Sequence, residues 1–206
     1  QDRAGNVGRQ ATHYKLKVDT QALPPRLLCP THPDKAAWSN HSRPRFEWFE
    51  PEDSSGVVGY YWSFDRSPAG LPSPASAAYT TERYAVLDRG VESDGVWWFH
   101  VVSRDRAGNV GVEAAHWPVR IDTQAAPPAI HSPSHPDRHG WSNQANAHFE
   151  WSAPEDPSGI IGYYYLLNRS QATVPGESNG TWTEENQASF AGLEDGIWTL
   201  HVVSKD

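Results

Sequence analysis

The chain has 206 residues, of which 37% are hydrophobic and 12% aromatic, so its composition is that of a folded protein rather than a disordered one. Its net charge of −8, with no cluster of Lys or Arg, gives no electrostatic footprint for nucleic acid or an anionic membrane, and neither is an expected partner. No apolar run approaches the roughly 20 residues of a membrane-spanning helix, and no signal segment leads the chain. Seventeen Pro and sixteen Gly, spread along the chain, favour short strands and turns and predict an all-β fold.

The first recognisable motif, DRAGNVG at residues 2–8, returns unchanged at residues 105–111 and belongs to a repeat that covers nearly the whole chain. An offset of 103 residues relates WSN at 38–40 to 141–143 and FEW at 46–48 to 149–151, and an offset of 101 relates HVVS at 100–103 to 201–204. A period near 100 residues fits tandem, independently folding domains rather than solenoid units. We therefore predict the last strand of a preceding or partner-chain module at 1–21, a complete β-sandwich module at 22–123, and a second module lacking its own last strand at 124–206.

Alternation of apolar and polar residues predicts the strands of one repeat, at 46–51, 57–64, 84–87, 95–103 and 116–121. In the strongest of these, Trp97, Phe99 and Val101 share one face, which we expect to be the core face because the second repeat keeps it apolar. The Pro-, Ser- and Ala-rich stretch at 66–78 predicts a loop or an irregular edge. DRAGNVG at 105–111 predicts a tight turn before the last strand.

This order of strands resembles the fibronectin type III family and, more loosely, bacterial Ig-like repeats that end in a D-x-A-G-N turn. The matching motifs are Phe46-Glu47-Trp48 with Pro51, Val58-Gly59-Tyr60, Leu87 with Asp94-Gly95, and the strand from Trp97 to Ser103 followed by Ala107-Gly108-Asn109. The resemblance covers both repeats and implies tandem Ig-like (fibronectin type III-like) β-sandwich domains. It implies little about function, because this sandwich hosts unrelated roles.

Catalytic chemistry has few candidates in this sequence. Nucleophile-elbow, zincin, P-loop and dinucleotide motifs are all absent, and the adjacent carboxylates Glu52 and Asp53 fit turn capping better than acid–base work. We therefore expect a non-enzymatic protein with no catalytic residues and no cofactor.

Metal binding is the second chemistry to consider. His131, His135 and His139 recur every four residues, but intervening prolines preclude the helix that would align them, so we predict no metal site there. A calcium site built from Asp53, Asp19 or Asp105 with loop carbonyls remains open, because calcium prefers oxygen ligands.

Consecutive aromatic residues are the best hint of a binding surface. Neighbours on a strand face opposite ways, so some large rings must be exposed or covered by a partner or a loop at 66–83. The candidate contacts for glycans or a partner are Tyr61, Trp62, Trp98, Tyr164 and Tyr165. Three N-x-S/T sequons add possible glycosylation at Asn40, Asn168 and Asn179.

Two hypotheses about function follow. The first is a structural module of an extracellular or cell-surface repeat protein, such as a stalk, adhesin or filament subunit, whose partners are neighbouring repeats or copies of itself arranged head-to-tail. In that case the 206 residues are either a slice of a longer array or a subunit that donates the strand carrying His13, Tyr14, Leu16 and Val18. The alternative is a carbohydrate-binding accessory module that uses the exposed aromatics.

Overall fold

The computed structural model describes residues 3–4, 10–88 and 90–206, and every regular element in these residues is a β-strand. The strands are β1 (Arg26–Leu28), β2 (Trp38–Ser39), β3 (Arg45–Phe49), β4 (Val57–Asp65), β5 (Ala78–Thr80), β6 (Tyr84–Val86), β7 (Gly95–Asp105), β8 (Ala115–Ile121), β9 (Ala129–His131), β10 (Ala147–Ser152), β11 (Gly162–Asn168), β12 (Thr181–Thr183), β13 (Gln187–Phe190) and β14 (Thr199–Lys205). The predicted all-β fold class is confirmed. Within the described residues, no helix is long and apolar enough to cross a membrane.

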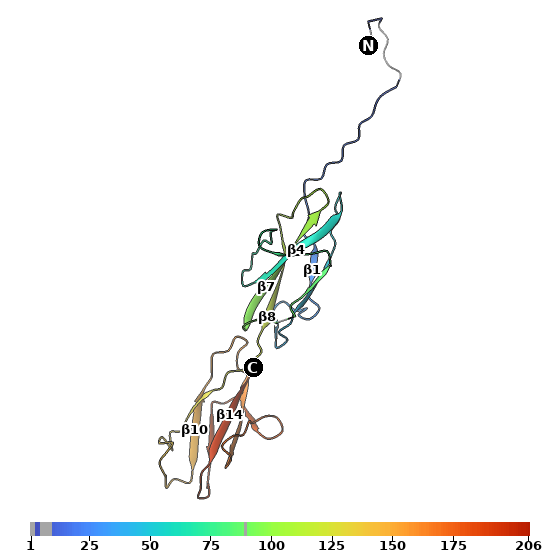
Figure 1. Ribbon diagram of the computed structural model, residues 1–206. Coiled ribbons are helices and arrows are strands. Elements are labelled where there is room, and N and C mark those ends of the chain that lie inside the picture. The colour runs from blue at the N-terminus through green and yellow to red at the C-terminus, as the bar shows by residue number, and fades with distance from the viewer. Residues whose placement is uncertain (1–2, 5–9, 89) are drawn as a thin grey trace. The chain divides into compact units, whose positions relative to one another are not determined.

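The strands form four sheets, with the orders β1-β3-β6, β2-β8-β7-β4-β5, β13-β10-β9 and β12-β11-β14 (Figure 1). By its contacts the chain divides into two compact units. The first comprises Gln1–Cys29, Phe46–Ala85 and Trp98–Trp117, and the second comprises Pro30–Arg45, Val86–Trp97 and Pro118–Asp206. These units do not coincide with the two sequence repeats, so the domain boundaries drawn from the repeats stay a prediction.

The core of the first unit lies between the sheet of β3 and the sheet of β4 and β7. Phe46 and Trp48 alternate with polar residues along β3 and are 0% and 3% exposed. Phe46 stacks on Phe99 of β7 with ring centroids 4.0 Å apart, and Trp48 meets Tyr60 of β4 edge to face. Rings of this size each bury about 150–250 Å², so this aromatic cluster dominates the packing of the unit.

Strand β7 is covered on both faces, which differs from the prediction of one core face led by Trp97. Phe99 and Val101 are fully buried, but so are His100 and Val102 on the opposite face. His116 of β8 contacts the His100 ring, and a side chain at Gly70 would collide with that ring, so the loop before β5 closes over it. Trp97 itself is half-buried at the start of the strand, where its indole N–H donates to the Ser93 carbonyl.

The core of the second unit is smaller and built from the same kinds of residue. Trp151 of β10 meets Tyr163 of β11 edge to face at 5.6 Å, and Tyr165 packs against Phe190 of β13. Val202 of β14 completes the buried cluster. The two facing sheets therefore form the sandwich that the FEW and GYY motifs predict.

Candidate functional site

Strand β14 forms one edge of its sheet. It pairs with β11 on one side, whereas its repeat counterpart β7 lies between β8 and β4. The exposed fractions of matching residues agree with this difference. Val102 of β7 is fully buried, whereas Val203 at the matching position of β14 is half-buried. Among the described residues no strand covers the second edge of β14.

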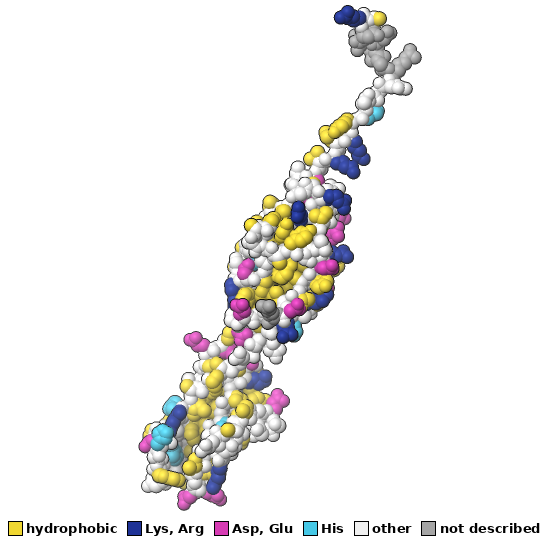
Figure 2. Space-filling model, viewed as in Figure 1, with side chains coloured by type: hydrophobic (Ala, Val, Ile, Leu, Met, Phe, Trp, Pro, Cys, Tyr) yellow, Lys and Arg dark blue, Asp and Glu magenta, His cyan; other side chains and the backbone are white. Residues whose placement is uncertain are grey.

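Residues 13–18 have the sequence of a last strand but form no strand, and no arrow marks them in Figure 1. Their apolar residues Tyr14, Leu16 and Val18 are 87%, 75% and 76% exposed. The matching residues of β8 include Val119 and Ile121, which are 1% and 0% exposed. Figure 2 shows hydrophobic side chains exposed along the N-terminal segment. The same alternating pattern is thus a core strand in one place and exposed chain in the other.

The two copies of the WSN motif differ in the same way. In the first, Trp38 and Ser39 form β2, which pairs in parallel with Arg120 and Ile121 of β8. The Arg120 guanidinium also lies 5.7 Å from the Trp38 ring centre. In the second copy the residues form no strand, and Trp141 is 84% exposed. Within the described part of the chain, the counterparts of the two elements that contact β8, namely β14 and the second WSN segment, therefore lack such a neighbour.

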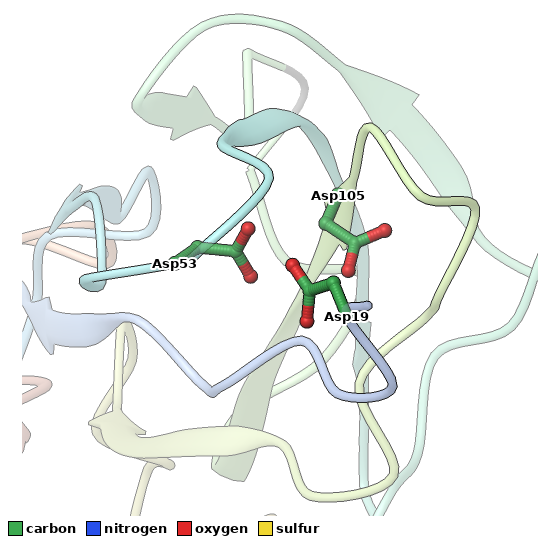
Figure 3. A group of neighbouring side chains, drawn as sticks. All are labelled: Asp19, Asp53 and Asp105. Carbon is green, nitrogen blue, oxygen red and sulfur yellow. The ribbon is translucent and has the colours of Figure 1, made fainter. Parts of the chain in front are cut away.

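Three carboxylates meet at one end of the first unit. Asp19, Asp53 and Asp105 each present an oxygen within 4.8 Å of the others, and Figure 3 shows them turned toward a common space. Asp53 Oδ1 accepts hydrogen bonds from Ser55 N, Ser55 Oγ and Gly56 N, which closes the turn after β3. Asp105 is 1% exposed and accepts from the backbone and side-chain amides of Asn109.

The second repeat builds the same cluster from Asp122, Asp156 and Asp206. Asp156 Oδ1 accepts from Ser158 and Gly159 as Asp53 does in its own turn, and Asp122 Oδ2 accepts from Ser158 N at 3.1 Å. The other oxygen, Asp156 Oδ2, is buried and has no hydrogen-bond partner. Among the described residues, no Lys, Arg or His forms an ion pair with either cluster.

Hydrogen bonds keep two of these carboxylates ionised. The Ser55 side chain, helped by the backbone N–H groups of Gln21 and Ser55, holds the pKa of Asp19 below 3.8 against the opposing effect of desolvation. Burial would raise the pKa of Asp122, but hydrogen bonds from Ser158 and Gln124 outweigh it and lower that pKa. The clusters therefore hold negative charge that the described chain does not neutralise. Such groups of carboxylate oxygens are ligands of Ca²⁺.

The candidate contact aromatics are packed to different degrees. Tyr61 is 8% exposed beneath Tyr79 of β5, with ring centres 5.1 Å apart, so the stretch before β6 covers it. Trp62 stacks on Phe99, and Tyr165 packs against Trp151. Tyr164 is half-buried beside Trp182, and Trp98 is half-buried on β7. The structure does not gather these five rings into one exposed row.

Other residues singled out by the sequence are dispersed. His135 makes hydrogen bonds through both ring nitrogens and His139 is exposed, so His131, His135 and His139 form no common ligand set. Asn40 is exposed, whereas the side chains of Asn168 and Asn179 make hydrogen bonds within their own loops. Cys29, the single cysteine of the chain, is buried.

Two features lie beyond what the sequence predicted. The WSN segment served only to mark the repeat, although Trp38 and Ser39 make a parallel strand. Asp53, Asp19 and Asp105 were candidates for a calcium site, but the repeat offsets also place Asp156, Asp122 and Asp206 in the same arrangement. The offsets of 103 and 101 residues were the signal that could have revealed the second cluster.

Comparison with known proteins supports no family assignment. No family model matches the chain, and no curated protein matches it. Among solved structures it is similar to the central fibronectin-III array of RIM-binding protein, with 14% identity, a TM-score of 0.32, and coverage of 91% of this chain and 60% of that one. It is also similar to α-L-rhamnosidase from Dictyoglumus thermophilum, with 10% identity, a TM-score of 0.38, and coverage of 74% of this chain and 18% of that one. The chain thus spans less than two thirds of either protein.

Proposed function

We propose that the chain is a non-enzymatic structural module of an extracellular or cell-surface repeat protein, in which residues 13–18 of one copy add as a strand to the free edge of β14 in the next copy. The proposal rests on the different environments of corresponding segments. β8 is buried against β7, whereas residues 13–18, which correspond to β8, are exposed. Among the described residues β14, which corresponds to β7, has a free edge. The pairing of β7 with β8 is the template for the proposed contact.

The donor segment fits this edge by its side chains and its main chain. Tyr14, Leu16 and Val18 would take the places that Trp117, Val119 and Ile121 occupy in β8. Lys15 replaces Pro118, so the segment has a main-chain N–H that β8 lacks at this position. In strand addition the main-chain hydrogen bonds supply affinity and the alternating side chains set the register.

The second WSN motif would gain a partner in the same assembly. Lys17 and Val18 correspond to Arg120 and Ile121, the residues that pair with β2. A donated strand would therefore cover Trp141 as β8 covers Trp38. Because donor and acceptor are different segments of one copy, the contact is heterologous and would extend into open filaments rather than closed dimers.

The experiment is light scattering of the full 206-residue chain over a wide concentration range, with paired variants. We expect species larger than the 22.9 kDa monomer, loss of association in Leu16→Ser, and its retention in Lys15→Ser, whose side chain lies on the opposite face. Amide hydrogen exchange should show the β14 amides that face away from β11 protected only in the assembled form. A chain that stays monomeric at every concentration, or that associates equally well as Leu16→Ser, would show the proposal to be wrong.

We also propose that the two aspartate clusters bind Ca²⁺. The buried, unpaired Asp156 Oδ2 is the specific observation in favour, because a carboxylate oxygen without a donor or cation is costly to bury. We expect Ca²⁺ titration by calorimetry to give saturable binding that Asp156→Asn weakens. Asp137→Asn, at an acid outside both clusters, is the control. No heat of binding, or equal binding by both variants, would refute the calcium proposal and leave strand addition untouched.

A further inference from the structure

Each aspartate cluster combines one residue from the segment that leads into a repeat with two residues from the body of that repeat. In the second cluster, Asp122 directly follows β8, the last strand of the first repeat. Asp156 lies in the turn after β10, and Asp206 directly follows β14. Two parts of the chain therefore carry the three carboxylates: the connection between the repeats and the body of the second repeat.

Asp122 is bonded to both repeats. Its main-chain N–H donates to the carbonyl of Ser39, at the end of β2, at 3.0 Å. Its carboxylate Oδ2 accepts from the main-chain N–H of Ser158, in the turn after β10, at 3.1 Å. All three residues belong to the same compact unit, and Asp122 is only 3% exposed. This one residue therefore joins the end of the first repeat to the turn that forms the second cluster.

The rest of the connection has no regular structure of its own. Residues 122–128 lead from β8 to β9 without forming a strand. Pro127 and Pro128 restrict its end, because the proline ring fixes φ. Bending of the connection therefore depends mainly on residues 122–126, which begin at the cluster.

The charge of the second cluster acts on this connection. The three carboxylate oxygens lie within 4.8 Å of one another, and like charges at such distances repel. Asp156 is fixed by the hydrogen bonds of its own turn, so movement of Asp122 with the connection relieves the repulsion. A Ca²⁺ ion reverses this effect, because it attracts all three carboxylates and gives the buried Asp156 Oδ2 a partner.

The first cluster has the same construction. Asp19 directly follows residues 13–18, and its Oδ2 accepts from Ser55 N at 2.8 Å. The Asn109 side-chain amide donates both to the Asp19 carbonyl, at 3.1 Å, and to Asp105 Oδ2. Figure 3 shows that the three carboxylates come from separate segments of the chain. The segment that enters the first repeat is thus joined to its body at the cluster, as in the second repeat.

We propose that Ca²⁺ bound at each cluster fixes the entering segment to the body of the repeat and thereby stiffens the connection between consecutive repeats. This inference rests on the calcium binding proposed above and does not require strand addition. Removal of the ion lets the connection at 122–128 bend more freely. In a filament, the first cluster would act in the same way at each contact between copies.

The test is NMR relaxation of the backbone ¹⁵N nuclei of the full chain, in Ca²⁺ and in a chelator at matched ionic strength. The chain carries Leu16→Ser, so that association of copies does not affect the result. Relaxation gives a rotational correlation time for each repeat. We expect one common time in Ca²⁺, and two shorter, separate times in the chelator. Calorimetry of the same samples measures binding itself, with two ions per chain expected from the two clusters.

Paired variants assign the effect to one cluster. Asp122→Asn removes one ligand charge from the second cluster, so it should weaken binding there at least about tenfold. At a Ca²⁺ concentration that just saturates the parent, the two repeats should then keep separate correlation times. Asp19→Asn is the matched change in the first cluster. It should also lose one bound ion but keep the common correlation time. Circular dichroism of each variant checks that the fold is kept.

The outcomes separate this inference from the calcium proposal. Calcium binding with unchanged correlation times would overturn the inference and leave the calcium proposal in place. No heat of binding would overturn both. Separate correlation times in Asp19→Asn as well as in Asp122→Asn would also overturn the inference, because each cluster would then not act on its own connection.

Discussion

Strands β7 and β14 carry the same HVVS sequence, at residues 100–103 and 201–204, in different surroundings. All four residues are fully buried in β7, whereas in β14 only Val202 is buried, at 9% exposure. The difference follows from β8, which flanks β7 and has no described counterpart beside β14, and from the loop before β5, which closes over His100. Burial of this motif is therefore decided by its neighbours in the fold rather than by the motif itself.

The largest expected effect on stability comes from truncating a buried side chain of β8. Ile121→Ala removes a fully buried side chain and should lower the free energy of unfolding by about 2–5 kcal/mol, because a cavity remains. The matching change, Val18→Ala, alters a residue that is 76% exposed and should shift the monomer by less than about 0.5 kcal/mol. Urea denaturation of dilute protein measures both. An equal loss in the two variants would mean that residues 13–18 are already docked in the monomer.

A second experiment adds to β14 a peptide that corresponds to β8, the strand that flanks β7. A synthetic peptide of residues 10–19, added to the full chain with the Leu16→Ser substitution, should stabilise the second repeat by about 2.7 kcal/mol at a hundred times its dissociation constant. Hydrogen exchange at β14 is the local readout, since its outer edge has no described partner. The same peptide carrying Leu16→Ser is the control. Equal protection by both peptides would indicate non-specific binding.

The turns after β3 and β10 offer a smaller effect that should be alike in the two repeats. Asp53 and Asp156 each accept three hydrogen bonds through one oxygen. Replacing either by Ala should cost about 1–2 kcal/mol in the absence of Ca²⁺. Thermal unfolding with a chelator measures this loss. A much larger loss at one of the two positions would show that the turns are not equivalent.

Much of the fold could be predicted from the sequence because the signals were local. The alternation in FEW predicts that Phe46 and Trp48 share one face of a half-buried strand, and both are indeed buried. The environment of β7 could not be predicted in the same way. His100 and Val102 are buried by β8 and by the loop that contains Gly70, and these contacts are distant in sequence.

At the candidate sites, too, the contacts between residues distant in sequence could not be predicted. The aspartates of the first cluster could be considered together because calcium prefers oxygen ligands, and their carboxylates do lie close together. Tyr61 was named as a candidate contact, with cover by the loop at 66–83 left open, and the position of Tyr79 above it depends on how β5 pairs with β4.

The smallest effect that we expect is a pH dependence of the stability of the first repeat, which arises from His116. His100 Nδ1 lies 2.6 Å from His116 Nδ1, and Asp65 lies 3.4 Å from the other His100 nitrogen. Burial, with some repulsion from His100, lowers the pKa of His116 below 6.5. Because the unfolded chain then binds this proton at higher pH than the folded chain, the contribution to stability is complete above pH 6.5 and is lost as pH falls toward the folded pKa.

We therefore expect the urea midpoint of the first repeat to fall on acidification through this window, and His116→Gln to flatten the dependence. A parent chain with a flat profile there would contradict the expectation.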